Sequence, residues 1–136
     1  MTRPPVGHRS IDHTGDLAIE VWAPTEAALL ARAAVALTEL LTDGATVPAT
    51  AQRTVKLECF DPEDRLVQWL SEVLYWATTE HFLLAHADVT LSPNTLAAAL
   101  YGAPGDVACE IKAVTYHDLS LVVHADHVTA RIVFDV

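Results

Sequence analysis

The chain is poor in basic residues: eight lysines and arginines stand against 18 aspartates and glutamates, a formal net charge of −10. Binding to a nucleic-acid backbone depends on clustered Lys and Arg, so this deficit argues against strong direct binding to RNA or DNA. An acidic surface is compatible with a basic protein partner or a divalent cation. An acidic surface can also simply keep a protein soluble, without a specific partner, and net charge by itself favours this simpler interpretation.

Long apolar runs and cysteines are scarce as well. No stretch reaches the roughly 18 consecutive apolar residues that a membrane-spanning helix needs, and residues 1–10 lack the apolar core of a secretory signal. We therefore expect a cytoplasmic protein with no membrane partner. Cys59 and Cys109 lie far apart, each within a strand-like run. We expect both to be small core residues rather than a disulfide or a zinc site.

Signatures of the common enzyme classes are missing. The sequence has no Walker A loop, no Gly-x-Gly-x-x-Gly after a strand and no Gly-x-Ser-x-Gly elbow. Neither cysteine lies in a recognisable cysteine–histidine context. We therefore predict no catalytic residue. A small hydrolase that uses Asp12 or Asp16 with His13 is a further hypothesis, but it lacks an evident nucleophile or phosphate loop.

Hydrophobic periodicity predicts alternating strands and helices. Residues 16–23 alternate as a half-buried strand, and a helix with a broad apolar stripe follows, N-capped by Thr25, to about residue 41. A second strand lies near residues 54–59, and Asp61-Pro62 begins a second helix. Further strands are predicted at residues 87–91, 96–101, 109–116, 119–124 and 128–134.

These elements favour an α+β protein. The 136 residues suit a single domain, with residues 1–10 as a loose N-terminal tail. Two amphipathic helices must bury their apolar stripes, and a sheet offers the surface for this. Short turns between the late strands favour antiparallel pairs. We predict a two-layer sandwich in which a mostly antiparallel or mixed sheet carries both main helices on one face.

The most informative segment is Asp12-His13-Thr14-Gly15-Asp16, which places three potential ligands directly before a strand. Its counterpart is Asp135, next to Val136. Because side chains alternate along a strand, Asp16 and Asp135 should both avoid the core face. Antiparallel neighbours would bring the two together, and adjacent carboxylates favour a proton or a hard cation between them. A turn acid and a separate exposed acid are the simpler alternative, which spacing alone favours.

The sequence leaves the roles of two further residues, His13 and Lys112, undecided. His13 can orient a ligand or act as a base, and it can equally cap a turn, which its position favours. Lys112 lies in a strand-like run that also carries a phenol and an imidazole, Tyr116 and His117. Lys112 can balance a nearby acid across a sheet, but it has no obvious catalytic partner in the sequence.

Several motifs, in the same order along the chain, resemble the archease family. They are Asp12-His13-Thr14-Gly15-Asp16-Leu17, Leu41-Thr42-Asp43, the Leu-x-x-Trp-Leu-x-x-x-Leu-Tyr pattern of residues 66–75, residues 110–117, and Phe134-Asp135-Val136. The resemblance runs nearly end to end. It departs at Gly15, where the family usually has Ala, and at residues 102–106, where relatives often carry a longer loop.

This resemblance implies a non-enzymatic accessory protein of an RtcB-type RNA ligase. Such a protein promotes formation of the ligase's covalent guanylate intermediate and supports multiple turnover in tRNA splicing or RNA repair. The family's metal-site acids fall on Asp16 and Asp135, and Val136 contributes a main-chain or terminal oxygen. The implied cofactor is a divalent metal ion, calcium.

The resemblance gives the neighbouring residues lesser roles. Asp12 and His13 belong to the same motif as supporting neighbours of Asp16, and Lys112 is a candidate for contact with the ligase. An alternative is a general chaperone-like interaction module in which the acidic residues are structural.

Overall fold

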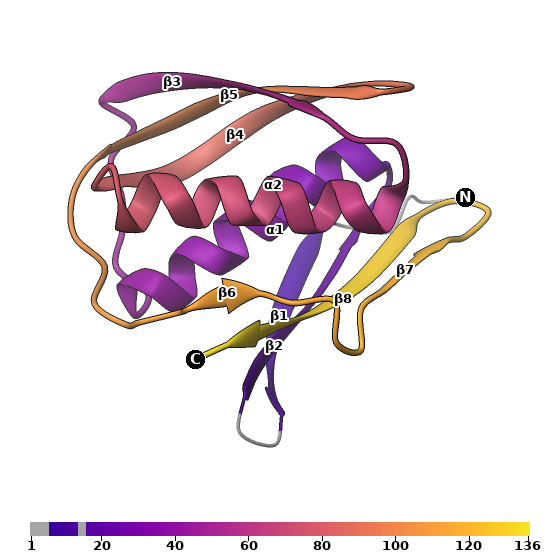
Figure 1. The fold of residues 1–136 in the computed structure, drawn as a ribbon, viewed down its shortest axis with the longest axis horizontal. Coiled ribbons are helices and arrows are strands. Elements are labelled where there is room, and N and C mark those ends of the chain that lie inside the picture. The colour runs from indigo at the N-terminus through magenta and orange to yellow at the C-terminus, as the bar shows by residue number, and fades with distance from the viewer. Residues whose placement is uncertain (1–5, 14–15) are drawn as a thin grey trace.

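The computed structural model describes residues 6–136 except 14 and 15, and for Asp12 and His13 it describes the backbone alone (Figure 1). The elements in chain order are β1 (Gly7–His13), β2 (Asp16–Ala23), α1 (Glu26–Thr42), β3 (Ala51–Glu58), α2 (Pro62–Thr78), β4 (Phe82–Ser92), β5 (Thr95–Pro104), β6 (Ala113–Val114), β7 (Ser120–Val123) and β8 (Val128–Asp135). Neither helix of this described part is long and apolar enough to cross a membrane.

The strands form two antiparallel sheets. One has the order β1-β2-β8-β6, with β7 also pairing with β8, and the other has the order β3-β5-β4. The helices lie between the sheets (Figure 1), since α1 contacts both β2 and β4, and α2 contacts both β4 and β6. The predicted α+β class, with antiparallel strands and two main helices, is confirmed. The predicted single sheet is divided into two, because alternation marks a strand's buried face and not the sheet that it joins.

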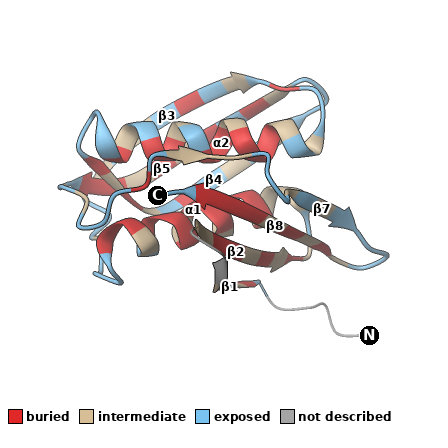
Figure 2. Ribbon diagram, turned by 60° about the horizontal axis from the view of Figure 1, so that its bottom comes forward, coloured by how far each residue is buried: buried red, intermediate tan, exposed pale blue. Residues whose placement is uncertain are grey.

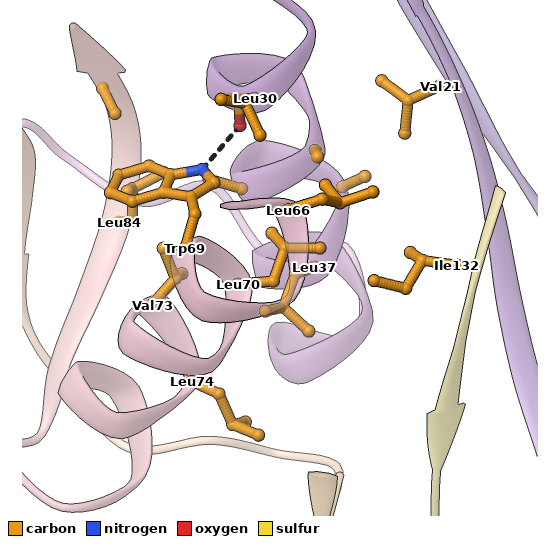
Figure 3. Close-up of a cluster of buried hydrophobic side chains, with 14 of the residues drawn as sticks. Val21, Leu30, Leu37, Leu66, Trp69, Leu70, Val73, Leu74, Leu84 and Ile132 are labelled. Atoms are coloured by element: carbon orange, nitrogen blue, oxygen red, sulfur yellow. Dashed lines mark hydrogen bonds between the residues drawn. The ribbon is translucent and has the colours of Figure 1, made fainter. Parts of the chain in front are cut away.

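Both helices contribute to the core between the sheets. Leu37 of α1 and Leu70 of α2 are fully buried and face Ile132 of β8 (Figure 3). The Trp69 ring is fully buried as well, and its Nε1–H donates to the Leu30 carbonyl of α1 at 2.7 Å. This bond satisfies the indole in a dry interior. Trp69 therefore joins the two helices by packing and by a hydrogen bond.

The two helices begin where the sequence predicts. Thr25 caps α1, and its hydroxyl accepts from the Ala28 N–H at 3.2 Å. Asp61 caps α2, and its carboxylate accepts from the Asp64 N–H at 2.9 Å. Pro62 follows at the first helical position, where its missing N–H costs nothing. The acids of this first turn also interact favourably with the positive end of the helix dipole.

The Asp61 cap gives a first prediction. We expect Asp61→Ala to lower the free energy of unfolding by about 1 kcal/mol, because the Asp64 N–H loses its acceptor. Asp61→Asn retains an acceptor oxygen and should keep most of that stability. Urea unfolding of both variants measures the difference. Equal losses in the two variants would show that the cap acceptor is not the stabilising feature.

Residues 7–10, predicted as part of a loose tail, instead belong to β1. This strand pairs with β2 along its whole length, from Gly7 opposite Trp22 to His13 opposite Asp16. A Cβ at position 7 would lie 2.6 Å from the Trp22 ring, so glycine leaves room for the indole to pack over β1. Backbone pairing rather than apolar alternation holds this edge strand in place, which is why its sequence shows little strand signal.

The strand predicted at residues 109–116 is reduced to the two residues of β6. The N–H groups of Ala108 and Cys109 both donate to the Leu41 carbonyl at the end of α1, so this backbone follows the helix end rather than a sheet. Cys109 is consequently exposed and not a core residue as predicted, whereas Cys59 is buried as predicted. Both thiols are free.

Candidate functional site

Asp16 and Asp135 end two neighbouring strands. β2 and β8 are antiparallel, and their paired register ends where Leu17 is opposite Phe134. Asp16 precedes Leu17 and Asp135 follows Phe134, so both acids lie at the same end of the sheet. The strand direction that the site hypothesis requires is thus present.

The two acids lie on the sheet face that points away from the helices. Leu17 packs against the core and Phe134 is fully buried in it, so alternation places the flanking Asp16 and Asp135 on the opposite face. Asp16 is half-buried and Asp135 is exposed. The exposed Asp135 carboxylate is therefore accessible to an ion or to a partner.

The backbone of Lys112 lies at the same end of the sheet as Asp135. Its N–H donates to the Asp135 carbonyl at 2.7 Å, and Ala113 pairs with Asp135 in the β6–β8 ladder. Both the N–H and the hydroxyl of Thr115 donate to the Val133 carbonyl, at 3.1 and 2.9 Å. Residues 112–115 therefore hold the end of β8 in a defined position beside β2. The side chain of Lys112 is exposed there.

The loop after β6 is anchored to α2. The Tyr116 hydroxyl donates to the Asp64 carboxylate at 2.8 Å. This hydrogen bond, together with the negative charge of Asp64, raises the pKa of Tyr116 above its usual 10. The phenol therefore stays protonated as a donor over the physiological pH range.

Asp12 and His13 are close to this end of the sheet through their backbone. Asp12 is opposite Leu17 and His13 is opposite Asp16 in the β1–β2 ladder. Their side chains, and the Thr14-Gly15 link, lie outside the described residues. Among the side chains that are described, no group of three or more His, Cys, Asp or Glu residues is placed to hold a metal ion. The ligand roles of Asp16, Asp135 and Val136 stay predictions.

A polar network between β1 and α1 has no counterpart in the sequence predictions. Arg32 Nε donates to His8 Nδ1 at 2.8 Å, and His8 Nε2 lies 2.7 Å from a Glu39 carboxylate oxygen. Because Nδ1 accepts, the ring proton resides on Nε2 and is donated to Glu39. His8 and Glu39 also line a hollow of about 430 Å³ near Cys109. The network residues come from two separate elements, β1 and α1, so no spacing along the chain predicts the network.

Together these features define a class: a small α+β protein with helices between two antiparallel sheets and an acidic pair at one sheet end. A model described as the Archease protein family (MTH1598/TM1083) matches residues 8–136. The chain belongs to the archease family.

Individual relatives agree with this assignment. Protein archease of Thermoplasma volcanium is 31% identical over 129 residues, which cover 92% of this chain and 96% of that protein. Protein archease of Methanosarcina barkeri is 29% identical over 136 residues, with 93% of each chain covered.

Two solved structures share the fold. The solution structure of Methanobacterium thermoautotrophicum protein 1598 has a TM-score of 0.73 at 22% identity and covers 96% of this chain and 99% of its own. The crystal structure of a Thermotoga maritima protein, described as an archease and possible chaperone, has a TM-score of 0.66 at 20% identity. That match covers 100% of this chain and 98% of the Thermotoga protein.

Proposed function

We propose that this chain is a non-catalytic activator of an RtcB-type RNA ligase. It binds a divalent cation, calcium, through Asp16, Asp135 and a main-chain or terminal oxygen of Val136. Through this site it promotes guanylylation of the ligase and supports repeated turnover in tRNA splicing or RNA repair. The observation that supports the proposal is that Asp16 and Asp135 lie at the same end of two adjacent antiparallel strands, in a chain of the archease family.

The donor set suits a hard cation. Calcium takes six to eight oxygen ligands, about 2.3–2.6 Å away, and tolerates irregular geometry. Two carboxylates and one carbonyl supply part of such a shell. The Asp135 carbonyl already accepts from Lys112, so the Asp135 carboxylate and the Val136 oxygen are the donors that this bond does not use.

An incomplete shell fits an accessory role. A site at an exposed sheet end leaves coordination positions that water or a group of the ligase can fill. The cation would supply positive charge to a developing negative charge at the guanylylation centre. Asp16 and Asp135 orient the cation, and the exposed Lys112 is placed to contact an acidic group of the ligase. The net charge of −10 keeps the chain from competing for RNA.

Guanylylation of the ligase tests this proposal. We expect the wild-type chain to accelerate the reaction, and Asp16→Ala or Asp135→Ala to reduce that acceleration at least roughly tenfold, since even changes beside metal ligands cost this much. The matched control is Asp88→Ala, which removes an exposed acid from β4 in the other sheet. The proposal is wrong if the wild type gives no acceleration, or if both site variants match the control.

A chaperone-like role is the competing function, and the description of the Thermotoga maritima structure favours it. A general chaperone should suppress aggregation of unrelated unfolded proteins, and this activity should not depend on Asp16 or Asp135. Light scattering of a heat-denatured client, with wild type and both alanine variants, separates the two functions. Equal suppression by all three would support the chaperone and oppose the metal-dependent activator.

A further inference from the structure

β7 is an edge strand with one open side. It pairs with β8 from Ser120 opposite Arg131 to Val123 opposite Val128, and with no other strand of the described chain. Figure 2 shows β7 largely exposed beside the buried β8, at the margin of the molecule. An edge of this kind presents backbone donors and acceptors that another extended segment can pair with.

The hydrogen-bond phase of the β7–β8 hairpin identifies the outward-facing groups. The His124 N–H donates to the His127 carbonyl at 2.8 Å, which makes these two residues a hydrogen-bonded pair. Bonded and non-bonded pairs alternate in an antiparallel ladder, so Val122 is bonded to β8 whereas Leu121 and Val123 are not. The N–H and C=O groups of Leu121 and Val123 therefore point to the open side. Neither residue has a further backbone partner among the described residues.

The side chains of β7 do not protect this edge. Val122 and Val123 are 46% and 69% exposed, on opposite faces of the strand. Natural edge strands are often kept very short or blocked by charged residues, proline or bulges. β7 is short, but it has no charged residue and no proline, whereas the longer edge strands β1, β3 and β4 carry ionisable side chains that include His8, Arg9, Lys56, Glu58, His86 and Asp88.

Acidic residues lie on segments that neighbour β7 in the chain or in space. α2 contacts β7, and its start carries the acids Asp61, Glu63 and Asp64, the last of which is bonded to Tyr116 just before β7. Asp126 lies in the turn after β7, where contact with His127 lowers the pKa of its carboxyl and keeps it ionised. Arg131 of β8 is a cation on the strand next to β7. In the ladders it is opposite Ser120 of β7 on one side and Glu20 of β2 on the other.

We propose that the open side of β7 docks an extended, basic segment of a partner protein as an added antiparallel strand. Leu121 and Val123 supply the backbone hydrogen bonds, the exposed valines contact apolar side chains, and the nearby acids attract Lys or Arg. A second copy of this chain fits poorly, because each copy carries a net charge of −10. The surface lies at the other end of β8 from Asp135, so the inference is independent of the metal-dependent function.

Amide NMR of the full chain tests this proposal. The probe is a short capped peptide of alternating Lys and Val, compared with peptides in which Glu replaces Lys or Pro replaces alternate residues. We expect the Lys-Val peptide to shift the β7 amides and to slow hydrogen exchange of the Leu121 and Val123 N–H groups. Added salt should weaken binding. The Glu and Pro peptides should leave these amides unchanged.

A pair of variants tests whether the outward-facing N–H of Val123 binds the added strand. Val123→Pro removes an outward N–H and no β7–β8 bond, so the chain should stay folded while the peptide binds about fivefold more weakly or worse. Val123→Thr keeps the N–H and the branched shape and should bind as the wild type does. Unchanged binding by a folded Val123→Pro variant, equal binding of the Glu peptide, or a response confined to other amides would overturn the proposal. Concentration-dependent β7 shifts without peptide would assign the edge to a second copy and overturn it as well.

Discussion

Trp69→Ala is expected to lower the free energy of unfolding by about 4 kcal/mol, the largest loss from any single truncation in this core. The ring is fully buried between α1 and β4, so its removal leaves a cavity that two helices and a sheet cannot close without moving (Figure 3). The substitution also leaves the Leu30 carbonyl without the indole donor. Chemical denaturation followed by far-ultraviolet circular dichroism measures the effect.

A comparison of two tryptophans separates packing from hydrogen bonding. Trp69→Phe keeps a large ring but removes the donor to Leu30, and should cost about 1–2 kcal/mol. Trp76→Phe removes a buried indole N–H that has no partner among the described residues, so it should be nearly neutral. Equal losses in the two phenylalanine variants would show that the Trp69 hydrogen bond does not contribute.

Glu26→Ala is expected to cost about 3 kcal/mol, because it leaves the buried Arg65 guanidinium without its counter-charge. Arg65 Nε donates to the Glu26 carboxylate at 2.6 Å, and the side chains are only 10% and 20% exposed. This hydrogen bond to Glu26 raises the pKa of Arg65, so Arg65 stays charged over the physiological pH range. The pair joins the first turns of α1 and α2. Urea denaturation of the purified variant measures the loss.

Two controls test whether the buried charge causes this loss. The double variant Glu26→Met with Arg65→Met should be clearly more stable than Glu26→Met alone, because no isolated charge remains. Glu20→Ala breaks the exposed Arg9–Glu20 pair, whose side chains are 66% and 35% exposed, and should cost less than about 1 kcal/mol. Similar losses from Glu20→Ala and Glu26→Ala would contradict the argument from burial.

The sequence predicts local structure where the determining interactions lie between residues close together in the chain. Thr25 and Asp61-Pro62 predicted both helix starts, because capping depends on atoms a few residues apart. The alternation of residues 16–23 predicted β2 and its buried face for the same reason. β1 was missed because pairing with β2 stabilises it, and residues 109–116 were overestimated because their backbone bonds the end of α1.

The candidate site, too, was predictable from the sequence only in part. Parity along each strand placed Asp16 and Asp135 off the core face from sequence alone, since alternation is a property of a single strand. The family motifs supplied their interpretation as a metal site. Two network residues, His8 and Arg32, gave no signal, because β1 and α1 contribute them separately.

The sequence by itself determined the helices with their caps, the alternation of the main strands and the acidity of the chain. These follow from interactions between near neighbours and from composition. Only the tertiary structure decided that the strands form two sheets, that β2 lies antiparallel to β8 with Asp16 and Asp135 at one end, and that β7 has an open edge. Backbone pairing between distant segments sets these features, and each peptide group offers the same donor and acceptor whatever its side chain.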